Sequence, residues 1–178
     1  SSLFIHQYSQ AWFDFRGKRE RYKNFKTNYH DNSEIASRAQ REFCKDLSKE
    51  FTGYSGNLWG ISASDSAKGY IAWGGPPREP ALDGTIVPYT PAASLMFAPD
   101  ISLPALKEIK EKYGDKVYGR YGFADAFNPN TGWVGPDVIG IDVGITLLGI
   151  ENFRTGNIWK WFMQNPETKN ALKLAKIK

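Results

Sequence analysis

The run from Val138 to Ile150 constrains the fold more than any other part of the sequence. It reads VIGIDVGITLLGI and is apolar almost throughout, with one charged residue, Asp142, near its middle. A helix that is apolar on nearly every side lies inside a protein. The run is also shorter than the ~20 apolar residues that a bilayer-spanning helix needs. We therefore predict an interior helix over residues 137–153 and no membrane span.

Two longer stretches have the spacing of amphipathic helices. In DNSEIASRAQREFCKDLSKEF, Asp31 with Glu34 three residues later forms a capping box. The apolar stripe expected to face the core there consists of Ile35, Ala39, Phe43, Leu47 and Phe51. In SLPALKEIKEKYG, Ser102 is the expected cap, Leu103 begins the apolar face, and Gly114 ends the helix.

Helices are also predicted at both ends of the chain. The opening LFIHQYSQAWFDF has apolar residues on one side, and Asn165 followed by Pro166 is typical of a helix start. Between the helices, Gly53–Pro99 is rich in Gly, Pro, Ser and aromatic residues, and we predict an ordered loop system over a site with at most short strands. The predicted fold class is all-α.

Composition excludes several kinds of site. With 178 residues, 41% of them hydrophobic, one domain is expected. The net charge is +4, but the 23 basic residues are interleaved with 19 acidic ones, which argues against a nucleic-acid partner. A single cysteine, Cys44, excludes an internal disulfide, and with only His6 and His30 beside it a zinc site has too few ligands. No phosphate-binding loop or serine-hydrolase elbow is present, so neither a cofactor nor a metal is expected.

The remaining chemistry lies in acidic residues that stand in apolar or small-residue surroundings. Five have this property: Asp14, Asp65, Asp125, Asp142 and Glu151. A buried carboxylate needs a partner or a wet cavity, and no basic residue lies within four positions of Asp142. Two such carboxyls flanking a glycosidic bond are what glycoside hydrolysis requires. Asp142 and Asp125 are therefore the main candidates.

The other acids have structural alternatives. Asp14 can pair with Arg16, and Asp65 is typical of a turn or a helix cap. Glu151 is out of phase with Asp142 on a helix, so we expect it to hold Arg154 or a backbone amide. Among the tryptophans, Trp159 and Trp161 are expected in the core. At least one of the tryptophans in glycine-rich loops is expected to line a cleft and stack on a sugar ring; these are Trp59, Trp73 and Trp133.

Four phrases extend these inferences: WGISASDSAKGYIAWGGPP, DGTIVPYTPAASLMFAPD, YGRYGFADAFNP and IGIDVGITLLGIENFRTGNIWKWFM. They resemble, in order, those of the glycoamylase-like family, which includes bacterial endo-β-1,2-glucanases of glycoside hydrolase family 144 and a region of cyclic β-1,2-glucan synthases. The resemblance runs from Leu3 to the C-terminus. One departure is Val143, where the family phrase IDQG has glutamine, and its loss is expected to alter one sugar contact.

The resemblance implies an (α/α)6 toroid around a cleft for β-glucan, of which residues 1–178 correspond to the C-terminal half. The expected partner is the N-terminal half of the same protein or another copy of the chain. The chain starts inside an amphipathic pattern, so we expect a fragment of a longer protein, with inner helices that expose apolar surface. The implied location is the bacterial periplasm or the cell exterior.

The implied activity is inverting hydrolysis of β-1,2-glucan. Asp142 is expected as general base and Asp125 as a ligand of a sugar hydroxyl, with the general acid on the absent half. Further substrate contacts are assigned to Trp59, Asp65, Trp73, Trp133, Tyr121 and Asp14. The alternatives are a glucan-binding fragment that does not cut and a transglycosylase-type homologue.

Overall fold

The computed structural model of the chain describes residues 2–22 and 25–178. About half of it is helical, and each strand has only two residues, so the all-α prediction is confirmed. The helices are α1 (Phe4–Trp12), α2 (Tyr29–Asp46), a 3-10 turn (Leu47–Lys49), α3 (Tyr89–Ser94), α4 (Pro99–Val117), α5 (Gly140–Arg154), α6 (Asn157–Phe162) and α7 (Pro166–Leu174). The strands are β1 (Tyr118–Gly119), β2 (Gly122–Phe123), β3 (Phe127–Asn128) and β4 (Trp133–Val134).

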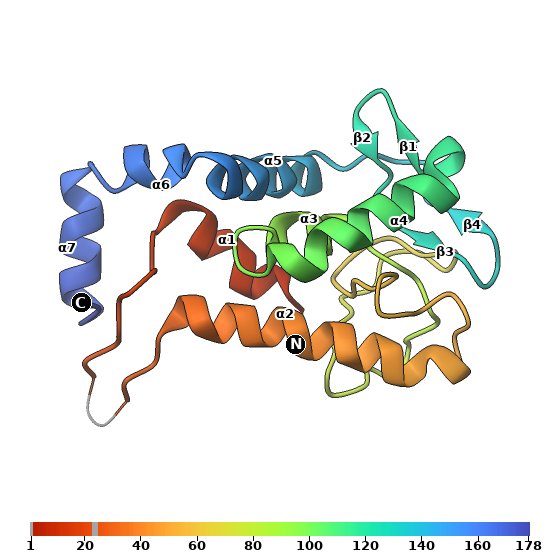
Figure 1. Ribbon diagram of the computed structural model, residues 1–178, viewed down its shortest axis with the longest axis horizontal. Coiled ribbons are helices and arrows are strands. Elements are labelled where there is room, and N and C mark those ends of the chain that lie inside the picture. The colour runs from red at the N-terminus through yellow and green to blue at the C-terminus, as the bar shows by residue number, and fades with distance from the viewer. Residues whose placement is uncertain (1, 23–24) are drawn as a thin grey trace.

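The helices lie in rows across the molecule (Figure 1). α5 and α6 run along one edge, the long α2 runs along the opposite edge, and α1, α3 and α4 lie between them. The strands form two antiparallel hairpins, with Tyr118 opposite Phe123 in one and Phe127 opposite Val134 in the other. Both hairpins lie at the end of the molecule away from α7.

Helix α3 is the centre of the packing. All six of its residues are buried, and it lies against both α4 and α5. A Cβ atom added at Gly149 of α5 would lie 2.8 Å from the Cα atom of Ala93, so the two backbones are in direct contact there. The prediction that Gly53–Pro99 is mostly loop is confirmed, but it missed this short helix.

The expected features of α2 are wrong in two respects. The cap is Asn28, whose side chain accepts hydrogen bonds from the backbone N–H groups of His30 and Asp31. The predicted apolar stripe holds only at its end, where Phe43, Leu47 and Phe51 are partly buried against the core. The fully buried face is polar and small, and Ile35 is 65% exposed. The buried residues are Ser33, Ser37, Gln40 and Cys44. The polar face can be buried because its groups find partners: the Gln40 amide donates to the carbonyl of Ile61 at 2.7 Å and accepts from its N–H at 2.8 Å.

Helix α4 is longer than predicted in both directions. It begins at Pro99, places Ser102 in a buried position inside the helix, and continues past Gly114 to Val117. Leu103 is 48% exposed, because the buried face passes through Ile101, Ser102, Ala105 and Ile109 instead. Proline is well suited to the first helical position, and Gly114 keeps a helical backbone conformation.

Helix α5 confirms the predicted helix around Asp142, although it begins three residues later, at Gly140. Ile145 and Gly149 face α3, whereas Ile141, Leu147 and Phe153 are 50%, 62% and 42% exposed. An apolar helix with one covered and one open side agrees with the expectation that apolar surface is exposed on this chain.

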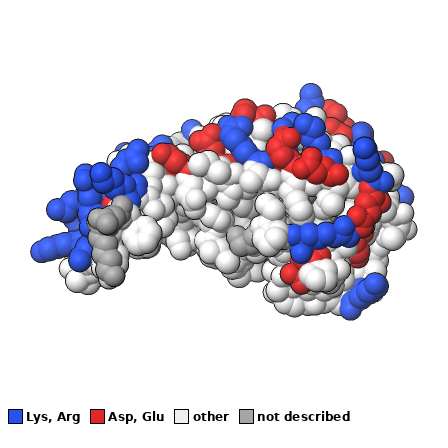
Figure 2. Space-filling view, turned by 90° about the horizontal axis from the view of Figure 1, so that it is seen from below, with Lys and Arg blue, Asp and Glu red and all other residues white. Residues whose placement is uncertain are grey.

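Hydrogen bonds connect both ends of the chain to the rest of the fold. The buried Trp159 Nε1 donates to the carbonyl of Gln10 at 2.6 Å, and α7 begins at Pro166 after Asn165, as predicted. Glu20 pairs with Ile177 in an isolated antiparallel bridge, which brings the two basic ends of the sequence together. Figure 2 shows Lys and Arg side chains gathered at one end of the molecule and a largely uncharged lower side.

None of the helices in residues 2–22 and 25–178 is long and apolar enough for a membrane span. The same residues contain no group of three or more His, Cys, Asp or Glu side chains placed to hold a metal ion.

Candidate active site

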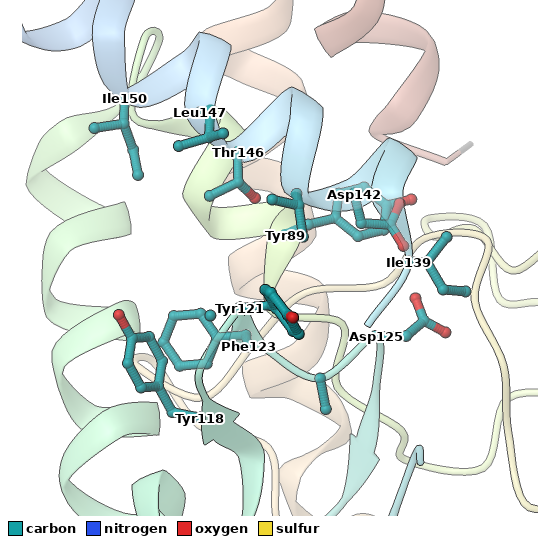
Figure 3. Close-up of a pocket in the computed structure, with 13 residues that line it drawn as sticks. Tyr89, Tyr118, Tyr121, Phe123, Asp125, Ile139, Asp142, Thr146, Leu147 and Ile150 are labelled. Carbon is teal, nitrogen blue, oxygen red and sulfur yellow. The ribbon is translucent and has the colours of Figure 1, made fainter. Parts of the chain in front are cut away.

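The structure brings Asp125 and Asp142 together at the edge of one hollow (Figure 3). Asp142 lies in the first turn of α5, and Asp125 lies between the two hairpins, where its backbone N–H donates to the carbonyl of Asp137 at 3.0 Å. Both are buried, with 8% and 3% of their surface exposed. The two carboxyl groups lie within hydrogen-bonding reach of each other, and each shifts the pKa of the other. Residues that are 17 positions apart in sequence therefore form one carboxyl pair.

The two oxygens of Asp125 have different surroundings. Oδ2 accepts a hydrogen bond of 2.6 Å from the backbone N–H of Asp65. Oδ1 is buried and receives no N–H or hydroxyl donor from the residues that the structure describes. A buried acceptor without a donor is costly. A proton on Asp142 is the donor that the paired arrangement can supply to the Asp125 carboxyl.

Two causes shift the pKa values of the pair: burial, and the contact between the two carboxyl groups. Burial raises the pKa of Asp142, and the hydrogen bond and the charge of Asp125 raise it further, to about 8. Burial also raises the pKa of Asp125, although the hydrogen bond from Asp142 and the N–H of Asp65 act in the opposite direction. At neutral pH the proton therefore stays on Asp142, while Asp125 is the first of the two to ionise.

The position of Asp142 at a helix N-terminus does not reverse this result. The helix dipole favours an ionised carboxylate there by only about 1 kcal/mol. Raising the pKa of Asp142 from 3.8 to about 8 corresponds to several kcal/mol, since one pKa unit is about 1.4 kcal/mol. Desolvation and the neighbouring carboxylate therefore outweigh the helix dipole.

Aromatic and apolar side chains form the rest of the hollow, which has a volume of about 320 Å³. Tyr118 and Phe123 pack edge to face, with ring centroids 4.8 Å apart, and Tyr121 is 65% exposed at the rim. Tyr89 is buried beside the carboxyl pair, and its hydroxyl donates to Ser62 Oγ at 2.7 Å. This combination of flat apolar faces and two carboxyls suits a ligand with apolar ring faces and hydroxyl groups.

Besides Asp125 and Asp142, two more of the predicted site residues are close to the hollow. Tyr121 is part of the lining, and Asp65 contributes through its backbone N–H, while its own carboxyl is half-buried next to the pair. Val143, where the family phrase has glutamine, also lines the hollow. Val143 thus gives the hollow an apolar side chain next to Asp142.

The predicted roles of the loop tryptophans are wrong for Trp59 and Trp73. Both are completely buried in the core, so neither can stack on a ligand in this conformation. The glycine-rich loops fold inward and pair with one another, for example through Val87 N–H and the carbonyl of Gly60 at 3.0 Å. Burying a large aromatic ring there is favourable. Trp133 is half-buried and lines a different hollow, so it does not lie with the carboxyl pair either.

Asp14 lies away from the carboxyl pair, and its ligand role stays a prediction. Its two oxygens accept from the Nε and Nη2 atoms of Arg16, both at 2.9 Å, and it does not line the hollow. The predicted pairing of Asp14 with Arg16 is thus observed. Glu151 accepts from Thr155 and Asn157 and lies 4.0 Å from Arg154, as expected.

Three lining residues of the hollow were not predicted from the sequence: Tyr89, Tyr118 and Phe123. Tyr118 and Phe123 are separated by GRYG, a glycine-rich connection that is typical of a tight hairpin, so their facing positions could have been inferred. Tyr89 begins the short buried helix α3, for which no periodic signal exists.

Comparison with known proteins identifies the family. The family described as "Putative glucoamylase" matches residues 1–166. The exo β-1,2-glucooligosaccharide sophorohydrolase (non-reducing end) of Parabacteroides distasonis is 32% identical over 177 residues, which are 99% of this chain and 24% of that protein.

Solved structures extend the comparison to the fold. An endo-β-1,2-glucanase from Chitinophaga pinensis, in a sophorotriose and glucose complex, is 32% identical with a TM-score of 0.89, covering 99% of this chain and 41% of that one. A β-1,2-glucanase from Parabacteroides distasonis is 31% identical with a TM-score of 0.88, covering 98% and 24%. The chain has the helical fold of part of these glucanase toroids and spans well under half of their length.

Proposed function

Because the chain belongs to the glycoamylase family, we propose that it forms part of a glycoside hydrolase that acts on β-1,2-linked glucan. The observation that carries the proposal is the buried Asp125–Asp142 pair at the edge of an aromatic hollow. Similar proteins named for action on β-1,2-linked glucose support the linkage. The proposed place of action is the periplasm or the cell exterior.

The pair supports a division of roles. Hydrolysis breaks the bond between C1 of one sugar and the bridging oxygen; water adds a hydroxyl to C1, and the bridging oxygen gains a proton. Asp142, protonated at neutral pH, supports donation of a proton or a hydrogen bond, and Asp125 supports acceptance from a sugar hydroxyl. Because these two carboxyls touch each other, the second carboxyl that flanks the bond is assigned to the part of the relatives' length that these residues do not span. This division reverses the sequence-based assignment of Asp142 as general base.

The remaining walls of the cleft come, in this proposal, from the part of the relatives' length that these residues do not span. The open sides of Leu147 and Tyr121 support this, because both are more than half exposed next to the carboxyl pair. Another segment of a longer protein that covers α5 would enclose a sugar chain and exclude water from it.

The test is hydrolysis of linear β-1,2-, β-1,3- and β-1,4-glucans by the polypeptide that carries these residues, measured as new reducing ends. We expect cleavage of the β-1,2-linked polymer. Asp142→Asn and Asp125→Asn should each lower kcat/KM by roughly 10²- to 10⁴-fold, the range for general acid and base groups. Asp115→Asn, an exposed position on α4, is the matched control and should leave kcat/KM unchanged.

Equal cleavage of all three polymers would contradict the linkage, and full turnover by Asp142→Asn would remove its catalytic role. Tight binding of β-1,2-glucan without any new reducing ends would identify the alternative, a binding protein that does not cut.

A further inference from the structure

The end of the molecule formed by residues 16–26 and 166–178, which we call the basic end, carries positive charge that the fold does not neutralise. Its described residues include nine basic and two acidic ones, and Figure 2 shows Lys and Arg side chains gathered there. Among the residues that the structure describes, Arg16 is the only one of the nine in an ion pair with an acidic side chain, 2.9 Å from Asp14. Seven of the others are exposed to water: Arg19, Arg21, Lys26, Lys169, Lys173, Lys176 and Lys178.

Backbone hydrogen bonds hold these cations close to one another. Arg19 N–H donates to the carbonyl of Lys178 at 2.6 Å, and Lys178 N–H donates back at 3.0 Å. Arg21 N–H donates to the carbonyl of Lys176 at 2.7 Å, and Arg19 Nη1 donates to the carbonyl of Lys26 at 3.3 Å. Like charges that a fold keeps together repel one another and disfavour the folded state. An extended anionic partner would remove this repulsion.

Apolar side chains are exposed among the cations. Leu174, which follows Lys173, is 74% exposed, and Phe25, which precedes Lys26, is 61% exposed. An aliphatic side chain such as that of Leu174 has no base edge or phosphate to bind in a nucleic acid. It can enter the boundary between the headgroups and the acyl chains of a bilayer. Cations together with exposed apolar side chains therefore favour a lipid surface over other polyanions.

We propose that the basic end docks on the surface of a bilayer that contains anionic lipids. The cations contact the lipid phosphates, and Leu174 and Phe25 enter the headgroup layer. The inference goes beyond the proposed function and does not depend on it. In this orientation the two hairpins, with Asp125 between them, lie at the end of the molecule away from the bilayer (Figure 1). The hollow at the carboxyl pair therefore stays accessible to a ligand in solution.

The experiment measures co-sedimentation of the polypeptide that carries these residues with lipid vesicles. One set of vesicles is phosphatidylcholine alone, and the other is a mixture of phosphatidylcholine with phosphatidylglycerol, which is anionic. We expect binding to the anionic vesicles and little binding to the neutral ones. Binding should weaken as the salt concentration rises, because salt screens the attraction between exposed charges.

A triple variant tests the cations. Arg21→Gln, Lys26→Gln and Lys173→Gln together remove three exposed charges from three segments of the basic end. Each cation near an anionic bilayer strengthens binding roughly fivefold, so the triple variant should bind the anionic vesicles on the order of 10²-fold more weakly.

The matched control has the same net charge but keeps the basic end intact. It combines Lys49→Gln in the 3-10 turn with Lys107→Gln and Lys116→Gln on α4, all at exposed positions. It should bind the vesicles nearly as well as the wild type. Circular dichroism of each variant checks that the fold is intact. Equal vesicle binding by the two triple variants would overturn the proposal, as would equal binding of the wild type to neutral and anionic vesicles or no binding to either.

A single variant separates a bilayer from other polyanions. Leu174→Gln keeps every charge and removes an exposed apolar side chain. It should weaken vesicle binding roughly three- to tenfold, because less apolar surface leaves water. It should leave any binding to a short DNA duplex unchanged. Tighter binding of the wild type to the duplex than to the vesicles, with no effect of Leu174→Gln on vesicle binding, would assign the basic end to nucleic acid and overturn the proposal.

Discussion

At the scale of single residues, Asp142 is the group whose environment departs most from that of an ordinary surface acid. Its folded-state pKa of about 8 exceeds its ordinary value of 3.8, so the folded state holds the proton more tightly than the unfolded state. Stability from this group is complete below pH 4 and is lost as the pH rises toward 8. The unfolding free energy should therefore fall between pH 5 and pH 8, by on the order of a few kcal/mol.

Asp142→Asn should remove most of that fall, because the amide keeps a donor for Asp125 but cannot ionise. Urea unfolding at pH 5 and pH 8 measures the difference, and Asp115→Asn on the exposed side of α4 should behave as the wild type. The same pH dependence in Asp142→Asn and in the wild type would show that Asp142 ionises normally.

The sequence identified Asp125 and Asp142 individually, because an acid in an apolar run without a basic neighbour needs a special environment. It did not show that the two carboxyls meet each other, since their contact depends on how α5 lies beside the segment between the hairpins. It also placed Trp59 and Trp73 wrongly. Glycine-rich composition predicts a loop, but it does not tell whether the loop's tryptophans face solvent or the core.

At the scale of elements, the contact between α3 and α5 sets the position of Asp142. A methyl group at Gly149 would lie 2.8 Å from the Cα atom and 2.9 Å from the carbonyl oxygen of Ala93, and backbone atoms cannot move aside easily. Gly149→Ala should lower the unfolding free energy by about 1–3 kcal/mol. It should also reduce glucan cleavage, because α5 would shift away from Asp125.

Gly144→Ala on the same helix is the control, because a methyl group there meets no atom within 4 Å. In a helix, alanine in place of glycine stabilises by roughly 0.5–1 kcal/mol. Chemical denaturation of both variants provides the comparison. Equal stability of the two would mean that α3 and α5 are not in close contact.

The elements with strong signals were predictable from the sequence. A long apolar run predicted α5, and Asn165 before Pro166 predicted the start of α7. The buried face of α2 was not predictable from apolar spacing, because Gln40 and its neighbours are buried through hydrogen bonds to loop backbone that is distant in sequence. α3 has only six residues, too few for a periodic pattern.

At the scale of the whole molecule, charge is distributed unevenly. The described parts of residues 16–26 and 166–178 contain nine basic and two acidic residues, and the bridge between Glu20 and Ile177 brings these segments together. This basic end could not be recognised in the sequence, because the two segments lie far apart along the chain and the basic residues between them alternate with acidic ones. The folded molecule has a basic end and a largely uncharged side (Figure 2).

The whole molecule also shows why the site is open. The chain spans 24% to 41% of the similar glucanases, and the exposed face of α5 lies next to the carboxyl pair. Apolar side chains that are exposed together normally mark a surface that another segment covers. We therefore expect full activity only in a polypeptide that supplies this cover.

We propose that cleavage of β-1,2-glucan requires the proton that Asp142 holds beside Asp125. The most direct measurement is kcat/KM for this polymer between pH 5 and pH 10, because kcat/KM reports the pKa values of the free enzyme. We predict that kcat/KM is highest near neutral pH and falls about tenfold per pH unit above about 8, as Asp142 loses its proton. A value of kcat/KM that stays constant or rises between pH 7 and pH 10 would contradict it.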